Sequence, residues 1–168
     1  EQALAHDAQR AESAIALTET LRLAKRFDEA VAAGRRATEL APESAPAWNN
    51  FGLALDEAER KEEAEVAFRR ALEVDPSHPK AHLNLGNLLR LAKRYSEAEA
   101  ELGTALRLKA DYHQAWNSLG VVLGDLGRPS EASEAFHQAL KLQPRYTKPL
   151  TNLGKLFLDL ERFPEALQ

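Results

Sequence analysis

The chain has 168 residues, of which 44% are hydrophobic and 29% are charged, proportions typical of a folded protein of about one domain. Its 22 basic and 26 acidic residues give a net charge of −4, which offers no electrostatic basis for binding nucleic acid or an anionic membrane surface. Cysteine is absent, so disulfides, thiolate metal sites and cysteine nucleophiles are excluded.

The first residues and the hydropathy pattern bear on where the protein resides. No stretch reaches the roughly 18 to 20 uninterrupted apolar residues of a membrane span, and charged residues occupy the beginning of the chain, where a signal peptide is apolar. We expect a soluble protein without membrane insertion, in an unknown compartment, with the cytoplasm favoured. Methionine is absent even from the first position, which indicates a fragment of a longer chain.

A period of 34 residues runs through the chain. Arginine, glutamate and alanine each recur five times at this spacing, in series that begin at Arg26, Glu29 and Ala30. A glycine series begins at Gly52, and Thr18 holds the glycine position of the first unit. The period divides the chain into units 11–44, 45–78, 79–112, 113–146 and a truncated unit 147–168.

The two ends fall outside complete units. Residues 1–10 are interpreted either as the end of a preceding repeat's second helix or as an extension of the first helix. Residues 163–168 stop inside an expected second helix. We expect a single domain over residues 1–168, cut at both ends, with more repeats or another domain after Gln168.

Each unit is predicted to be a helical hairpin. In the third unit, apolar residues form one stripe at helical spacing over 81–92 and another over 98–106, separated by a short polar turn. Ser96 is expected to cap the second helix, with Glu99 completing a capping box. The equivalent cap positions are Asp28, Ser130 and Pro164. One hairpin cannot bury both stripes alone, so neighbouring hairpins must stack.

The fourth unit contains Trp116, then Leu119-Gly120, then Ala132-x3-Phe136, then Pro144. This order resembles the signature of the tetratricopeptide repeat family, with leucine in place of its tyrosine. The resemblance implies an all-α fold, an α-solenoid in which stacked antiparallel helix hairpins form a right-handed superhelix. The signature residues are packing residues, so they identify the fold and leave the function open.

Two units depart from the signature. The third has His82 at the tryptophan position, which we interpret as a packing substitute. The first is the most divergent, with Ala14 at the tryptophan position, Thr18 at the glycine position and Gly34 at the phenylalanine position. The signature therefore specifies the helix packing of the first unit least.

The resemblance implies that the first helix of each hairpin lines a concave groove. Residues on the free side of these helices are the candidate peptide-binding residues: Asn50, Leu53, Lys80, Asn84, Asn87, Gln114, Ser118, Val121, Lys148, Asn152 and Lys155. An asparagine offers both a donor and an acceptor, so asparagines one repeat apart can bind the backbone of an extended peptide whatever its side chains. The alternative is that asparagine is simply a common, solvated choice at this position.

These asparagines resemble the ladder in the tetratricopeptide region of O-linked N-acetylglucosamine transferases, where such a ladder holds substrate polypeptide. Ser118 and Ala16 interrupt the series here. The leading hypothesis is a noncatalytic scaffold that binds a protein or peptide, and the alternative is the substrate-recruiting arm of a larger enzyme such as a glycosyltransferase. A lysine, asparagine and arginine clamp for a C-terminal carboxylate is not supplied by any set of repeats, and Lys148 with Asn152 is a partial echo only.

Enzyme and metal chemistry have little support in the sequence. His78 and His82 are four residues apart, but Pro79 places His78 outside the helix and no carboxylate completes a zinc pattern. No glycine-rich phosphate loop occurs. We expect no catalytic residues, no metal and no cofactor. Self-association through exposed terminal repeats is a further hypothesis.

Overall fold

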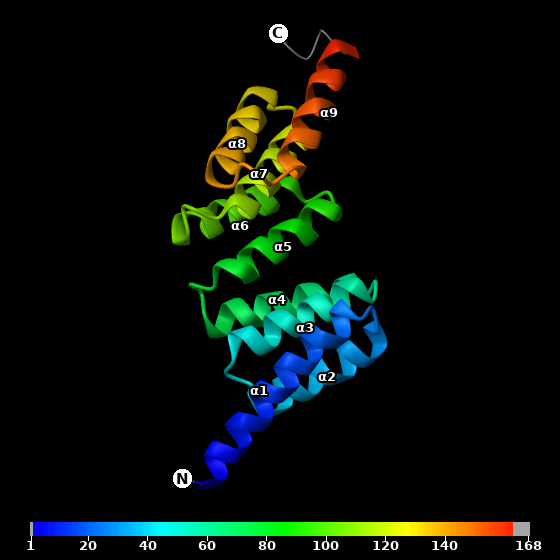
Figure 1. Ribbon diagram of the computed structural model, residues 1–168, viewed down its shortest axis with the longest axis vertical. Coiled ribbons are helices and arrows are strands. Elements are labelled where there is room, and N and C mark those ends of the chain that lie inside the picture. Colours follow the sequence, from blue (N-terminus) through cyan, green and yellow to red (C-terminus); the bar gives the residue numbers. More distant parts are fainter. Residues whose placement is uncertain (1, 163–168) are drawn as a thin grey trace. The chain divides into compact units, whose positions relative to one another are not determined.

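The computed structural model describes the backbone of residues 2–162, and the side chains of residues 9–156 and of Leu158. Throughout this part of the chain the regular elements are helices, and none of it forms a strand (Figure 1). The helices are α1 (Gln2–Leu23), α2 (Phe27–Leu40), α3 (Ala45–Glu57), α4 (Lys61–Val74), α5 (Pro79–Leu91), α6 (Tyr95–Leu108), α7 (His113–Asp125), α8 (Pro129–Leu142) and α9 (Lys148–Arg162).

The helices follow the period of the sequence. Helices α3, α5 and α7 begin at Ala45, Pro79 and His113, which are 34 residues apart, and α2, α4, α6 and α8 begin at the same interval. Pro76 and Pro144 lie just after α4 and α8, where a proline cannot continue the hydrogen-bonded helix. The predicted helical hairpins and their 34-residue spacing are confirmed.

Residues 2–10 belong to the same continuous helix as residues 11–23. They therefore extend the first helix, which is the second of the two interpretations of this segment. No turn separates this segment from the first unit. No proline or glycine occurs between residues 2 and 23 to interrupt the helix.

The chain divides into two compact units, Glu1–Leu88 and Leu89–Gln168, with the boundary inside α5. The sequence predicts one domain over the same residues. In the first unit, α1 packs against α2 and α3, and α3 also packs against α2 and α4. In the second unit, α7 packs against α6, α8 and α9.

Glycine and phenylalanine of the signature meet inside the second and fourth hairpins. A Cβ atom added to Gly52 would lie 2.6 Å from Cε1 of Phe68, so only glycine fits against this ring. Gly120 stands in the same relation to Phe136. Both phenylalanines are buried, which places them in the core as the sequence predicts.

The first hairpin solves the same packing problem with other residues. Its glycine position holds the fully buried Thr18, and its phenylalanine position holds the buried Gly34. A Cβ atom on Gly34 would lie 2.9 Å from Cδ2 of Phe51 in the next hairpin. In the first hairpin the glycine position thus holds the larger Thr18 and the phenylalanine position holds the smaller Gly34. The ring of Phe51 covers Gly34.

In the second, third and fourth repeats, the residue at the tryptophan position contacts the end of the preceding repeat. Nε1 of Trp48 donates to the carbonyl of Pro42 at 2.8 Å, and Nε1 of Trp116 donates to the carbonyl of Ala110 at 2.9 Å. Nε2 of His82 lies 3.0 Å from the carbonyl of Pro76, six residues earlier as in the other two cases. This contact confirms the interpretation of His82 as a substitute for tryptophan.

The predicted serine caps are wrong. The N-cap of α6 is Arg94, and Ser96 lies inside the first turn. The Arg94 guanidinium instead forms two hydrogen bonds with the Glu97 carboxylate, at 2.6 and 2.7 Å. Glu99 accepts from Arg128 at 2.7 Å rather than completing a capping box. Carboxylates in a helix's first turn also interact favourably with the helix dipole.

The same arginine and glutamate arrangement begins the other second helices. Arg26 pairs with Glu29, Arg60 with Glu63 and Arg128 with Glu131, each at 2.6–2.7 Å. This pair accounts for the first four members of two residue series in the sequence, and the fifth glutamate, Glu165, lies outside the described residues. Asp28 and Ser130 accordingly lie within helices and not at their caps, and Pro164 lies outside the described residues.

Candidate peptide-binding site

The candidate residues of the first compact unit, Glu1–Leu88, lie on α3 and α5. We call them the first-unit stripe: Asn50, Leu53, Lys80, Asn84 and Asn87. Lys80 is exposed and the other four are half-buried. All five therefore present part of their surface to solvent.

Asn84 is fixed by a buried asparagine that the sequence analysis did not single out. Nδ2 of Asn84 donates to Oδ1 of Asn49 at 2.8 Å, which links α5 to α3. Asn49 is only 3% exposed, and its own Nδ2 donates to Oδ1 of Asn50 at 3.5 Å. The amide of Asn84 is thus held in one orientation, and its carbonyl oxygen accepts no hydrogen bond from the described residues.

The second unit repeats this arrangement on α7 and α9. Nδ2 of Asn152 donates to Oδ1 of Asn117 at 2.9 Å, and Asn117 is buried. The signal in the sequence is that Asn49 and Asn117 each precede a candidate asparagine by 35 residues, one more than the repeat period. The sequence analysis did not use this spacing, because it indicates a contact only when the shift of neighbouring first helices along each other is known.

The other candidate residues of the second unit lie on the same two helices. Together with Asn152 they form the second-unit stripe: Gln114, Ser118, Val121, Lys148 and Lys155. Ser118, Val121 and Asn152 are half-buried, and the two lysines and Gln114 are exposed. Asp159, which continues the stripe in the sequence, has a side chain outside the described residues.

Ion pairs between neighbouring first helices supplement the amide pairs. Arg22 of α1 forms two hydrogen bonds with the Glu57 carboxylate of α3, at 2.7 and 2.9 Å. Arg90 of α5 contacts Asp125 of α7 at 3.1 Å. These pairs also join residues 35 positions apart. The carboxylates of Glu57 and Asp125 are thus paired with arginines of the chain itself.

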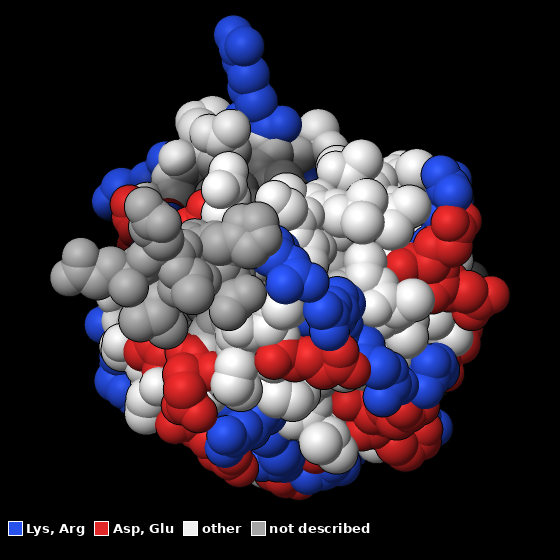
Figure 2. Space-filling model, turned by 90° about the horizontal axis from the view of Figure 1, so that it is seen from below, with Lys and Arg blue, Asp and Glu red and all other residues white. Residues whose placement is uncertain are grey.

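The two stripes offer amide, hydroxyl and ammonium groups beside apolar side chains. Among the described side chains, no group of three or more histidine, aspartate and glutamate residues is arranged to hold a metal ion. Nδ1 of His78 lies 3.7 Å from Asp75, and burial lowers the pKa of His78 more than this carboxylate raises it. In Figure 2, acidic and basic side chains are interspersed on the described part of the face drawn.

Stacked hairpins of two helices with a 34-residue period define a tetratricopeptide-like α-solenoid. Solved structures that share the fold include the following three. PilF of Pseudomonas aeruginosa matches with a TM-score of 0.85 and 23% identity over 97% of this chain and 74% of that one. MamA matches with a TM-score of 0.74 and 19% identity over 89% and 88%. The first tetratricopeptide domain of Spaghetti (RPAP3), bound to the HSP90 peptide SRMEEVD, matches with a TM-score of 0.67 and 21% identity over 70% and 94%.

The chain belongs to the family of the middle TPR-like domain of cilia and flagella-associated protein 70, whose model matches residues 40–143. The search of curated proteins found no match. The comparisons establish the fold and the family, whereas the resemblance to O-linked N-acetylglucosamine transferases is not shown by them. No described helix has both the length and the apolar character needed to cross a membrane.

Proposed function

We propose that this protein is a noncatalytic scaffold whose first-unit stripe binds an extended segment of another polypeptide. The observation that carries the proposal is the amide pair of Asn49 and Asn84. A buried asparagine holds a partly exposed one in a fixed orientation, so the carbonyl oxygen and the second N–H of Asn84 are preorganised for a ligand. Preorganisation reduces the conformational entropy that a side chain loses on binding.

The residues around Asn84 suit a peptide backbone. Asn50 and Asn87 add amides on either side, and the half-buried Leu53 adds apolar surface. Polar groups that fix orientation, beside a small apolar area, are the usual composition of a peptide groove. The Spaghetti (RPAP3) domain, which shares the fold, was solved with a bound peptide, and this supports a peptide as the type of ligand.

The second-unit stripe offers the same type of amide at Asn152, with Lys148 and Lys155 exposed beside it. We propose that it is a second contact surface for polypeptide. Its two lysines favour a segment with carboxylates, whereas the first-unit stripe has Lys80 alone.

The test begins with the selection of binders from a library of random dodecapeptides displayed on phage. The strongest synthetic peptide is then titrated by calorimetry into the wild type and into Asn84→Ala and Asn49→Ala. We expect Asn84→Ala to weaken binding by about tenfold, the effect of losing one or two hydrogen bonds. Asn49→Ala is the comparison, because it removes the same bond between helices but leaves Asn84 to contact the ligand, so we expect it to weaken binding by less than Asn84→Ala does.

Three results would contradict the proposal. Equal losses of affinity in the two variants would mean that Asn84 acts only through the link between α3 and α5. Unchanged affinity in Asn84→Ala would mean that the peptide binds elsewhere. A selection that enriches no peptide would contradict the claim that the protein binds extended peptides. Thermal unfolding of both variants shows whether an effect on binding comes from a loss of folded protein.

A further inference from the structure

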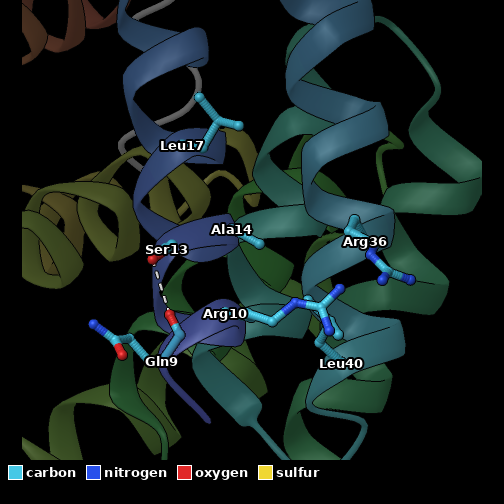
Figure 3. A pocket seen from close by; sticks show the side chains of 7 residues that line it. All are labelled: Gln9, Arg10, Ser13, Ala14, Leu17, Arg36 and Leu40. Carbon is cyan, nitrogen blue, oxygen red and sulfur yellow. Dashed lines mark hydrogen bonds between the residues drawn. The ribbon is translucent and has the colours of Figure 1, made fainter. Parts of the chain in front are cut away.

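A pocket of about 540 Å³ lies between α1 and α2, and none of the residues of the first-unit stripe lines it (Figure 3). Its lining residues are Gln9, Arg10, Ser13, Ala14, Leu17, Arg36 and Leu40. The figure shows Arg10 of α1 reaching toward α2, near Arg36 and Leu40. Pockets of this size accommodate a ligand larger than a single side chain.

The next repeat shows what normally occupies such a place. Thirty-four residues after Ala14 stands Trp48, which packs with Leu72 and Val74 against a buried cluster that includes Ala71. Val74 corresponds to Leu40 of the pocket. Because Ala14 carries only a methyl group, the first repeat provides no indole to cover the equivalent position between its own two helices.

The pocket also differs from the equivalent place in the next repeat by one carboxylate. Arg36 corresponds to Arg70, and both arginines pair with a glutamate three residues later, at 3.2 and 2.9 Å. Arg70 has in addition the carboxylate of Glu43 at 3.9 Å. The residue equivalent to Glu43 is Gln9, which lines the pocket as a neutral amide. Among the described residues, the equivalent positions Ala14 and Gln9 thus supply neither the indole nor this second carboxylate.

The apolar wall of the pocket is open to solvent. Leu17 is 51% exposed, whereas Phe51, its equivalent in the second repeat, is 8% exposed because it packs over Gly34. An exposed apolar wall beside the Arg36 guanidinium suits a ligand with an apolar anchor and negative charge.

We propose that the α1/α2 pocket binds an acidic segment of another polypeptide, which inserts one aromatic side chain beside Ala14 and presents a carboxylate to Arg36. The ligand then provides the two groups that Trp48 and Glu43 provide at the equivalent place beside α4. A central aromatic anchor with charged neighbours is a common basis of affinity in protein interfaces. This site is distinct from the first-unit stripe, so the two proposals are tested separately.

The probe is a fluorescein-labelled peptide, Glu-Glu-Ala-Trp-Ala-Glu-Glu, followed by fluorescence anisotropy. Ala14→Trp fills the pocket with the residue that the second repeat has at this position. Arg36→Glu reverses the charge that faces the ligand. Arg145→Glu is the control for net charge, since Arg145 is exposed in the turn before α9, and Asn84→Ala is the control for the first-unit stripe.

We expect Ala14→Trp and Arg36→Glu each to weaken binding at least about tenfold, and the two control variants to change it less than about twofold. Unlabelled peptides with alanine for tryptophan, or lysine for glutamate, should fail to compete. The proposal is overturned if the probe does not bind at about 1 mM protein, or if Ala14→Trp binds as the wild type does. Loss of binding in Asn84→Ala alone would also overturn it and would assign the peptide to the stripe.

A second copy of the chain is the competing occupant. If it fills the pocket, sedimentation velocity will show association that rises with concentration and is abolished by Ala14→Trp, while the probe peptide does not bind. That result would overturn the proposal of an acidic aromatic ligand. Thermal unfolding of Ala14→Trp and Arg36→Glu provides the check that both variants remain folded.

Discussion

Gly120 lies against the ring of Phe136, so that a Cβ atom on Gly120 would be 2.5 Å from Cε1 of the phenylalanine. The two helices α7 and α8 can pack this closely only because the residue is glycine. The same relation between Gly52 and Phe68 makes it a property of the repeat and not of one hairpin.

Gly120→Ala should therefore destabilise the protein by about 1–3 kcal/mol, the usual cost of overpacking a well-filled core. Gly154 is the matched control, since it holds the same repeat position and has no described atom within 4 Å of an added Cβ. Gly154→Ala should be neutral, or stabilising by up to about 1 kcal/mol through helix propensity. Urea unfolding measures both, and equal effects at the two glycines would contradict this packing account.

The first repeat should not tolerate restoration of the family signature at Gly34. Because Phe51 already covers this glycine, Gly34→Phe should lower the melting temperature even though phenylalanine is the signature residue there. The comparison is Leu102→Phe, which introduces the signature aromatic in the third repeat. Thermal unfolding followed by circular dichroism measures the melting temperatures. A melting temperature of Gly34→Phe at or above that of the wild type would contradict the prediction.

His82 should contribute through the hydrogen bond of its ring nitrogen as well as through packing. His82→Phe removes the contact with the Pro76 carbonyl and should cost about 1 kcal/mol, the usual net value of one hydrogen bond. His82→Trp restores a donor like those of Trp48 and Trp116 and should be the more stable of the two variants. Chemical unfolding measures both variants. A free energy of unfolding for His82→Phe equal to or above that of His82→Trp would contradict a contribution from the hydrogen bond.

The arginine and glutamate pairs at the starts of the second helices predict an acid dependence of stability. Hydrogen bonds from arginine lower the pKa of Glu29, Glu63 and Glu131. A carboxyl whose pKa is lower in the folded state contributes stability above its unfolded pKa of about 4.3, and this contribution is lost as the pH falls through the folded value.

The free energy of unfolding should consequently decline below about pH 4.5, near the unfolded pKa of glutamate. Replacing the three glutamates by glutamine should make the decline shallower. Glu62→Gln is the control, because no ion pair of Glu62 exists within the described part of the chain. Urea titrations from pH 7 to pH 3 measure the slope, and identical slopes in the triple variant and the wild type would contradict the prediction.

The hairpins were predictable because small and aromatic packing residues repeat in the sequence itself. Gly120 and Phe136 show their spacing directly, and that spacing determines which helices meet. The starts of the second helices were not predicted, because the preference for serine at a cap gave no weight to Arg94 and Glu97. The arginine and glutamate series was visible, but its cause required the geometry of the turn.

The candidate site was predictable only in part. The periodicity placed Asn84 on the free side of its helix, and the structure leaves it partly exposed. Its pairing with Asn49 depends on how far neighbouring helices are shifted along each other, which periodicity within a helix does not contain. The α1/α2 pocket likewise depends on absent bulk at Ala14, which appears in the sequence only as a departure from the signature.

The most direct test of the proposed function is a map of the amide groups that a bound polypeptide perturbs. Two-dimensional ¹⁵N–¹H NMR spectra are recorded during titration with the best peptide from the random library. We predict that the largest shift changes fall on the side-chain amides of Asn50, Asn84 and Asn87 and on the backbone near Leu53. Changes confined to the second helices α2 and α4, with these side-chain amides unmoved, would contradict the proposal that the first-unit stripe binds polypeptide.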